Sequence, residues 1–384
     1  MSLIDKLREN RWIYPVLSRA RWTGGRALMR LFHACFGVEK DTVLFSSYAG
    51  RGYSDNPRCV SEALHALRPE LKIVWQLEDG AAPRDLPDYV CVVRAHSLGA
   101  LRAFSTARCI VDNMNRPQYM LKFPGQLYLQ TWHGDRGFKR VLFDMGTNEP
   151  FPDGAQMDLA VSGSAFGSRV YRSSLRYEGE IMELGCPRND ILVKNPPEEA
   201  AAARKALSVP EGARVLLYAP TFRDAQRGHV HKAGLSLEAV RETLEAATGE
   251  RWLCLTRGHE QTRGVAADGA RDVSDFPDVS RPLLACDMVI TDYSSIGGDF
   301  MLLGRPVIYY QLDRGAYDAE RGLYFDPDQS PLLVAHSQDE LLEMLSNPID
   351  GPANCRAVLD FFGANETGHA SQSVAEWISA RMKG

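Results

Sequence analysis

The chain has 384 residues, of which 45% are hydrophobic and 24% charged, and its net charge at pH 7 is −5. This length suits two domains rather than one, and the composition is that of a globular protein able to bury a full core. The charge argues against a general attraction to nucleic acid or anionic lipid. The eight cysteines are widely spaced without a Cys-x-x-Cys pair, so neither a zinc site nor a disulfide framework is predicted.

The first 40 residues are more basic than the rest of the chain. Up to residue 30 they contain seven Lys or Arg and two Asp or Glu, with Trp12, Tyr14 and Trp22 among them. Such a segment suits a helix in the headgroup region of an anionic membrane. It suits equally a helix packed on the first domain with solvated arginines. We expect Pro15 and Gly24–Gly25 to interrupt any long amphipathic face.

From residue 42 onward, short apolar runs alternate with helical patterns. The runs are continuously apolar, as in parallel strands that are covered on both faces. Predicted strands lie at 42–47, 72–77, 89–93, 109–113, 127–132 and 158–163, and then at 214–220, 251–256, 287–292 and 306–310. Predicted helices include Pro57–Leu67, Ser164–Leu175, Leu235–Ala247 and Asp339–Leu345.

These repeated βα units predict an α/β fold with two doubly wound, Rossmann-like domains facing each other across a cleft. A Pro-Pro break near residue 196 marks the border. The expected divisions are a basic segment at 1–40, one α/β domain at 41–200, a second at 201–365 and a C-terminal helix at 366–384. Ligands of such sheets bind at the carboxyl ends of the strands.

The stretch TDYSSIGGDF (291–300) follows a predicted strand. A helix beginning near Ser294 would expose backbone N–H groups, and Ser294 and Ser295 could cap it or hold a phosphate. Gly297 and Gly298 would let backbone or ligand come close. Taken alone, the pattern is explained as well by a capped helix whose glycines serve packing.

Two more predicted strands of the second half end in polar residues. "YAPTFRD" places Thr221 and Arg223 at one strand exit, and "LTRGHE" places Arg257 and His259 at the next. Hydroxyls, arginines and a histidine at neighbouring strand exits are what a diphosphate site requires.

The first half has polar strand exits as well. "TWHG" places His133 after a strand, and "SYAGRGYSDNP" contributes Arg51, Asp55 and Asn56. A histidine at a strand exit that faces an anion site is a candidate general base, because imidazole titrates near neutral pH.

Six stretches of the chain, in this order, resemble motifs of the CDP-glycerol glycerophosphotransferase family, which includes teichoic acid primases and polymerases. They are "SYAGRGYSDNP", "TWHG", "GCPRNDIL", "YAPTFRD", "RGH" and "DVSDFPDVSRPLLACDMVITDYSSIGGDFMLLGRPVIYY". The resemblance implies a GT-B architecture and metal-independent transfer of a polyol phosphate from a CDP-activated donor. The implied acceptor is a hydroxyl on a membrane-embedded, polyprenyl-diphosphate-linked glycan.

The resemblance also implies roles for individual residues. His133 matches the family's general base, His259 its second essential histidine, and Ser294 with Ser295 its diphosphate contact. The other donor-side residues would be Thr221, Arg223 and Arg257. Acceptor-side or supporting residues would be Arg51, Asp55, Asn56, Lys139, Asp292 and Asp299. The resemblance makes the 41–200 domain the acceptor side and the 201–365 domain the donor side.

The chain departs from the family pattern in two places. "DRGFKR" follows "TWHG" where the family has T-P-L-K-K, and "PDQSPLLVAH" replaces an expected Pro-Gly-rich stretch. The acceptor side and the contacts to the donor base therefore differ from the common pattern. The chain is also too short for the extra N-terminal domain of the polymerases, which favours a primase-like enzyme.

Two alternatives remain open at this point. One is a GT-B glycosyltransferase that uses a UDP- or GDP-sugar, and the other is a non-catalytic nucleotide-binding scaffold. No signal peptide or membrane-spanning stretch is recognisable, so we expect a cytoplasmic protein, peripheral on the inner face of the plasma membrane. We expect no metal, cofactor or nucleic-acid partner, and the sequence leaves the oligomeric state open.

Overall fold

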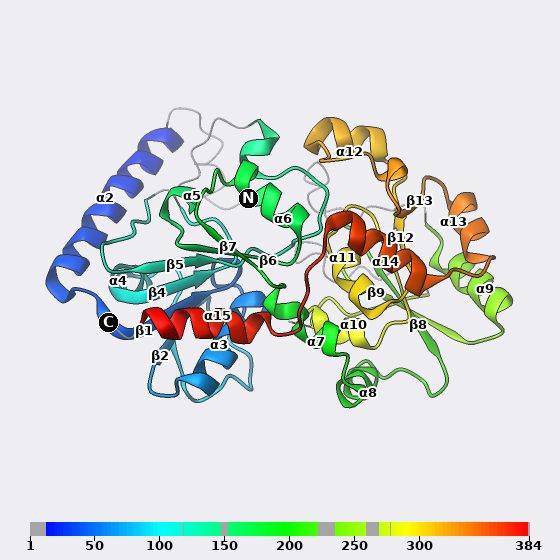
Figure 1. Ribbon diagram of the computed structural model, residues 1–384, viewed down its shortest axis with the longest axis horizontal. Helices are drawn as coiled ribbons and strands as arrows, with labels where there is room; N and C mark the ends of the chain where they lie inside the picture. Colours follow the sequence, from blue (N-terminus) through cyan, green and yellow to red (C-terminus); the bar gives the residue numbers. More distant parts are fainter. Residues whose placement is uncertain are drawn as a thin grey trace.

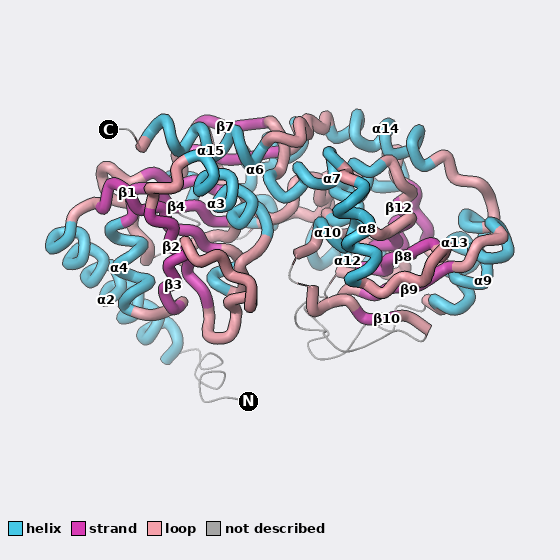
Figure 2. Tube along the Cα trace, turned by 90° about the horizontal axis from the view of Figure 1, so that it is seen from below, coloured by secondary structure: helices cyan, strands magenta, loops and turns pink. Residues whose placement is uncertain are grey.

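The protein is described by a computed structural model over residues 13–117, 119–146, 153–221, 235–258, 269–276 and 278–382. It contains two all-parallel β-sheets with helices on both faces, side by side in Figures 1 and 2. The first sheet contains β1 (Glu39–Ser46), β2 (Lys72–Leu77), β3 (Val90–Arg94), β4 (Ala107–Asp112), β5 (Leu127–Gln130), β6 (Leu159–Ser162) and β7 (Glu180–Glu183). The second contains β8 (Arg214–Ala219), β9 (Trp252–Thr256), β10 (Arg271–Asp272), β11 (Met288–Thr291), β12 (Val307–Tyr310) and β13 (Leu333–Ala335).

The strand orders are β3-β2-β1-β4-β5-β6-β7 and β10-β9-β8-β11-β12-β13. In both sheets the order reverses at the first strand, which is the arrangement of doubly wound α/β sheets. Both faces of each sheet are buried. In β1, for example, Val43 and Phe45 join one hydrophobic core while Leu44 joins the core on the opposite face. This explains why the strands are continuously apolar in sequence.

Helices connect the strands. Those around the first sheet are α2 (Ile13–Phe36), α3 (Asp55–Leu67), α4 (Leu98–Thr106), α5 (Asp153–Gln156), α6 (Ala165–Ser174) and α7 (Asp190–Lys194). The later helices are α8 (Pro197–Ala206), α9 (Leu237–Thr248), α10 (Ser280–Leu284), α11 (Ile296–Phe300), α12 (Arg314–Arg321), α13 (Gln338–Leu345), α14 (Gly351–Phe362) and α15 (Ala370–Arg381).

The ten predicted strands and the four named helices are all present, with small shifts at their ends. Three strands were not predicted. β7 has the sequence "EIME", β10 comprises two residues and β13 three, so none carries the apolar run by which the others were found.

Pro15 and Gly24–Gly25, which were expected to interrupt any long amphipathic face, do not break the helix itself. α2 runs without a break from Ile13 to Phe36. Gly25 packs on Tyr119, since a Cβ at this glycine would lie 2.9 Å from the ring.

The chain crosses back to the first sheet at its C-terminal end. After α14, residues 363–369 lead to α15, which packs against α3 in Figure 1. Val374, Trp377 and Ile378 of α15 belong to the core formed by β1, β2 and β4. Two crossings therefore join the sheets, one through α7 and α8 and one before α15.

Candidate active site

The loop that carries His133 touches the start of α11, which belongs to the other sheet. β5 ends at Gln130, and Trp132 turns the chain with a positive φ of 51°. At Gly134, a Cβ would lie 2.6 Å from the Ser295 hydroxyl oxygen. Only glycine lets the two segments approach so closely. The predicted base and the predicted diphosphate serine are thus brought together from different sheets.

Hydrogen bonding fixes the tautomer of the His133 ring. Its Nδ1 lies 2.6 Å from the carbonyl oxygen of Asn113, the residue after β4. Because a carbonyl only accepts, Nδ1 carries the hydrogen and Nε2 of the neutral ring keeps its lone pair. Burial lowers the pKa of His133 below its ordinary value. The ring is therefore a neutral base at pH 7.

The backbone around His133 is held by side chains from two other strand exits. Asn56 donates through Nδ2 to the carbonyl oxygens of Thr131 at 3.1 Å and Trp132 at 2.9 Å. Arg188 donates through Nη1 to the carbonyl oxygen of His133 at 2.8 Å. The indole of Trp132 also stacks on the imidazole, with ring centroids 4.6 Å apart. His133 is preorganised before any ligand binds.

Asp55 is an ion-pair partner rather than a free acid. Its Oδ2 accepts from the Tyr48 hydroxyl at 2.6 Å and from Arg188 Nη1 at 2.7 Å. Burial raises the pKa of the Asp55 carboxyl, but the Arg188 charge and the Tyr48 hydrogen bond outweigh this and hold it below its ordinary value. Asp55 is therefore ionised at neutral pH.

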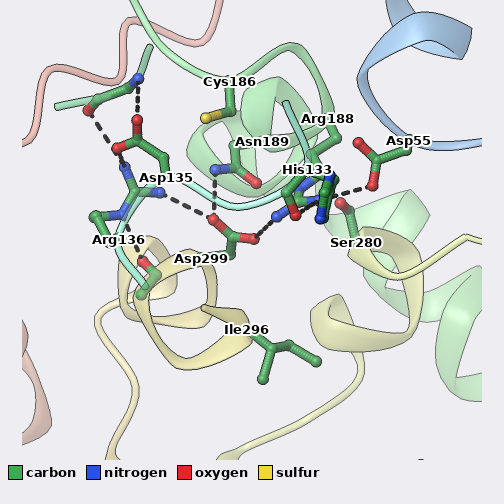
Figure 3. Close-up of polar contacts among 12 residues, drawn as sticks. Asp55, His133, Asp135, Arg136, Cys186, Arg188, Asn189, Ser280, Ile296 and Asp299 are labelled. Atoms are coloured by element: carbon green, nitrogen blue, oxygen red, sulfur yellow. Dashed lines mark hydrogen bonds and ion pairs between the residues drawn. The ribbon is translucent and has the colours of Figure 1, made fainter. Parts of the chain in front are cut away.

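Asp299 lies between two arginines of the opposite lobe, as Figure 3 shows. It accepts from Arg136 Nη2 at 3.1 Å, Arg188 Nη2 at 2.6 Å and Asn189 Nδ2 at 2.9 Å. Arg136 also pairs with Glu366, at 2.7 Å, in the segment before α15. These side chains are almost fully buried, so the Asp299 carboxylate holds the two arginines in place. The supporting role predicted for Asp299 stays a prediction.

The two serines at the start of α11 contribute little to capping this helix. Ser295 occupies the N-cap position without a side-chain cap hydrogen bond to any described residue. Among the described residues, the Ser294 hydroxyl accepts one long bond, 3.4 Å, from the N–H of Ile296. Both residues are half-buried. Their hydroxyls therefore remain suited to a phosphate contact, which stays a prediction.

Gly297 and Gly298, expected to let backbone or ligand come close, allow close approach of other parts of the protein. A Cβ at Gly297 would lie 2.4 Å from the Tyr309 hydroxyl, and one at Gly298 would lie 2.7 Å from Cβ of Arg136. These glycines let α11 pack on β12 and on the opposite lobe. The packing explanation holds for the glycines of this motif.

Thr221 and Asp292 join two strand exits of the second sheet. Asp292 Oδ1 accepts from the Thr221 N–H at 2.8 Å, the Thr221 hydroxyl at 2.5 Å and the Tyr293 N–H at 2.6 Å. The hydroxyl hydrogen of Thr221 is thus already donated to a carboxylate. Asp292 positions the loop, and a direct hydroxyl contact from Thr221 to phosphate stays a prediction.

The predicted arginines and the predicted lysine differ in their contacts and in their exposure. Arg257 donates to the carbonyl oxygens of Val273 at 3.2 Å and Phe276 at 2.8 Å, so it holds the segment that follows β10. Arg51 is exposed and donates to the Tyr48 carbonyl oxygen at 2.8 Å. Lys139 is half-buried, and its charge is one of those that lower the pKa of His133, although burial is the main cause. Arg223 and His259 lie outside the described residues.

Comparison with known proteins identifies the family of this chain. Residues 27–380 match the family described as CDP-glycerol:poly(glycerophosphate) glycerophosphotransferase. The chain belongs to this family. It is 30% identical over 369 residues to a teichoic acid glycerol-phosphate transferase of Staphylococcus aureus, covering 88% of this chain and 93% of that protein.

Two further similarities concern teichoic acid polymerases of the glycerophosphotransferase family. The chain is 30% identical over 366 residues to the teichoic acid poly(glycerol phosphate) polymerase of Bacillus subtilis, covering 89% of this chain. It spans about half of that polymerase, 49% of its length. A solved structure of the wall teichoic acid polymerase TagF superposes with a TM-score of 0.81 at 26% identity, covering 97% of this chain and 99% of that one.

Several residues of this candidate site had no predicted role, among them Asn113, Arg136 and Arg188. Arg188 lies in "GCPRNDIL", a stretch that carried the family resemblance without a role for any residue. It follows β7, and because this strand was not predicted, the arginine was not recognised as a residue at a strand exit. Asn113 contributes a backbone carbonyl, which side-chain patterns do not reveal.

Proposed function

We propose that this protein transfers a polyol phosphate, most simply glycerol phosphate, from a CDP-activated donor to an acceptor hydroxyl and releases CMP. The acceptor would belong to a lipid-linked glycan or a growing teichoic-acid-type polymer. The observation that carries this proposal is the neutral His133, whose Nδ1 is tied to Asn113 while its loop touches Ser295. The relatives named above act on glycerol phosphate polymers, which supports the same chemistry.

The reaction would be an in-line displacement at the β-phosphorus of the donor. The acceptor oxygen forms a bond to phosphorus while the bond to the CMP oxygen breaks, and His133 Nε2 takes the acceptor's proton. Ser294, Ser295 and Arg223 would hold the diphosphate, and His259 would stabilise or protonate the leaving CMP. Such catalysis relies on positioned donors and charges. Metal independence stays a prediction, and turnover in the presence of a chelator tests it.

The cleft of a GT-B enzyme is the proposed place of this reaction, with the donor on the second sheet and the acceptor on the first. The polar residues described above follow β1, β4, β5 and β7 of one sheet and β8, β9 and β11 of the other. Carboxyl ends of parallel strands are the usual ligand sites of such sheets. This arrangement supports two Rossmann-like lobes that share one site.

We also propose that α2 attaches the protein to an anionic membrane surface from the cytoplasmic side. The helix packs on α4 through Met29, yet its large apolar side chains include Leu31 and Phe36, which are 55% and 51% exposed. Exposed arginines on the same helix are Arg19, Arg21, Arg26 and Arg30. Cations and apolar groups on one exposed helix fit the headgroup region of a bilayer. Of the helices in the described part of the chain, none is long and apolar enough to cross it.

Vesicle sedimentation tests this attachment with the whole chain. We expect sedimentation with phosphatidylglycerol vesicles and little with phosphatidylcholine vesicles. The double variant Arg26→Glu/Arg30→Glu should stay in the supernatant, whereas Arg214→Glu, on β8, should behave as the parent protein. Equal sedimentation of both variants would exclude α2 as the attachment site.

The nucleotide released from the donor tests the activity. The protein is incubated with CDP-glycerol, CDP-ribitol or UDP-sugars, with and without a lipid-linked acceptor. CMP release that depends on acceptor supports the proposal and identifies the polyol. Release of UDP would favour a GT-B glycosyltransferase, and nucleotide binding without turnover would favour a scaffold.

A further inference from the structure

Arg188, like Arg136, joins the loop of His133 to α11. It lies in the 3₁₀ turn Pro187–Asn189 after β7 and is 7% exposed. Its Nη1 donates to Asp55 Oδ2 at 2.7 Å and to the His133 carbonyl oxygen at 2.8 Å. Its Nη2 donates to Asp299 Oδ2 at 2.6 Å. One guanidinium therefore contacts three segments at once (Figure 3).

The contact with Asp299 extends to the serine at the start of α11. The Asp299 N–H donates to the carbonyl oxygen of Ser295 at 3.2 Å, within the first turn of the helix. On the other side, the Arg188 N–H donates to Asn56 Oδ1 at 2.9 Å, and Asn56 holds the carbonyls of Thr131 and Trp132. Arg188 is thereby braced at both backbone and side chain.

We propose that Arg188 is a positioning residue that fixes the separation between His133 and Ser295, so that the proton acceptor and the phosphate contact are aligned for in-line transfer. This inference rests on the proposed function. A planar guanidinium with several N–H donors holds three acceptors in fixed directions, which an ammonium group cannot reproduce. Because an error of about 1 Å in such alignment can cost about 10²-fold in rate, Arg188 would act on kcat.

Arg188 also belongs to the charges that surround the imidazole. The groups that face His133 are the Asn113 carbonyl, the Asp55 carboxylate, the Arg188 guanidinium and the Lys139 ammonium. Burial is the largest influence on the pKa of His133; Asp55 raises that pKa, whereas Arg188 and Lys139 lower it. Neutralising Arg188 should therefore raise the pKa of His133, and neutralising Asp55 should lower it.

The sign of each shift can be read in the pH profile. A base works in its neutral form, so kcat/KM falls as the pH drops through its pKa. The acid limb should move to higher pH in Arg188→Gln and to lower pH in Asp55→Asn. A residue that only maintains the fold would give both variants the same loss with no opposite shifts.

Four variants test the proposal through CMP release from CDP-glycerol. In Arg188→Gln we expect kcat to fall by about 10²-fold with little change in donor KM, and Arg188→Lys should recover part of the loss. The double variant Arg188→Gln/Asp299→Asn keeps the charge of the cluster balanced and should remain slow. Arg214→Gln removes an arginine at the start of β8, outside the site, and should match the parent.

Several outcomes would overturn the inference. These are a normal kcat in the double variant, a change confined to KM, or acid limbs that do not move in opposite directions. If Arg188→Gln does not fold, Arg188→Lys and the double variant decide the question. An NMR titration of His133, assigned by its loss in His133→Gln, measures the pKa without turnover. A parent protein that releases no CMP would refute the proposed function, whereas unchanged His133 pKa values in the variants would refute the inference alone.

Discussion

The two sides of the site differ in how completely the protein satisfies its own polar groups. On the first sheet, Arg188 donates to the Asp55 carboxylate at 2.7 Å and to the His133 carbonyl oxygen at 2.8 Å, and His133 Nδ1 donates to the Asn113 carbonyl oxygen at 2.6 Å. On the second sheet, the hydroxyls of Ser294 and Ser295 have at most one long contact within the described residues. The fold holds His133 in place, while the two serine hydroxyls retain hydrogen-bonding capacity.

From this difference we infer that the first sheet positions a proton acceptor, whereas the serines of the second sheet bind a ligand. A buried ionic network is costly to assemble and gives a defined geometry, which suits a proton acceptor that must not drift. Hydroxyls that are not used by the fold suit a group that arrives with the substrate. Changes on the first sheet should therefore affect rate and stability, and changes at the serines should affect donor binding.

The largest effect is expected for His133→Ala. Removal of a general base costs roughly 10²–10⁴-fold in turnover, with little change in the affinity for the donor. CMP release on a true acceptor measures the rate, and donor titration measures affinity. His369→Ala, at an exposed histidine just before α15, provides a control that should remain active. Near-normal turnover in His133→Ala would remove this residue from the mechanism.

Asp299→Ala tests how much the buried ionic network of the first sheet contributes to the stability of the protein. It leaves the guanidinium groups of Arg136 and Arg188 without their shared carboxylate in a buried cluster. Loss of one partner of a buried ion pair costs about 3–5 kcal/mol in the free energy of unfolding. Asp328→Ala, which removes an exposed partner of Arg314, should cost at most about 1 kcal/mol. Urea unfolding followed by circular dichroism compares the two, and equal losses would contradict the assigned importance of Asp299.

Gly134→Ala tests the contact between the two sides directly. The added methyl group would lie 2.6 Å from the Ser295 hydroxyl oxygen, so the His133 loop and α11 must move apart. We expect kcat to fall by about 10-fold to 10²-fold with the fold retained. Gly315→Ala on α12 has no atom within 4 Å of the new methyl group and serves as the control. Unchanged turnover would mean that this close approach is not needed for catalysis.

The sequence predicts the sheets better than it predicts the links between them. Strands such as β11 and β12 are short, largely apolar runs, so their ends were nearly correct. His133, Asp55 and Ser295 were recognisable because polar residues follow such runs. The role of Arg188 was not recognisable, since its partners Asp299 and Asp55 lie 111 and 133 residues away. Contacts at such separations depend on how the two sheets pack, and a local sequence pattern does not predict them.

The smallest effect is expected for Ser295→Ala. This variant tests whether the second sheet contributes to donor binding without contributing to stability. The hydroxyl is not a cap, so its removal should leave the unfolding free energy within about 0.5 kcal/mol of the parent. One lost hydrogen bond to a charged phosphate corresponds to about 1.5–3 kcal/mol, which is about 10-fold to 10²-fold in donor affinity or rate.

Parallel measurement of stability and of the donor KM on Ser295→Ala and on Ser346→Ala separates the two contributions. Ser346 is exposed at the end of α13, where its hydroxyl donates to the Leu342 carbonyl oxygen at 2.7 Å. If Ser295→Ala unfolds more easily while its donor kinetics match those of Ser346→Ala, the serine belongs to the fold. The second sheet would then need another group, such as the backbone N–H of Ile296, to receive the phosphate.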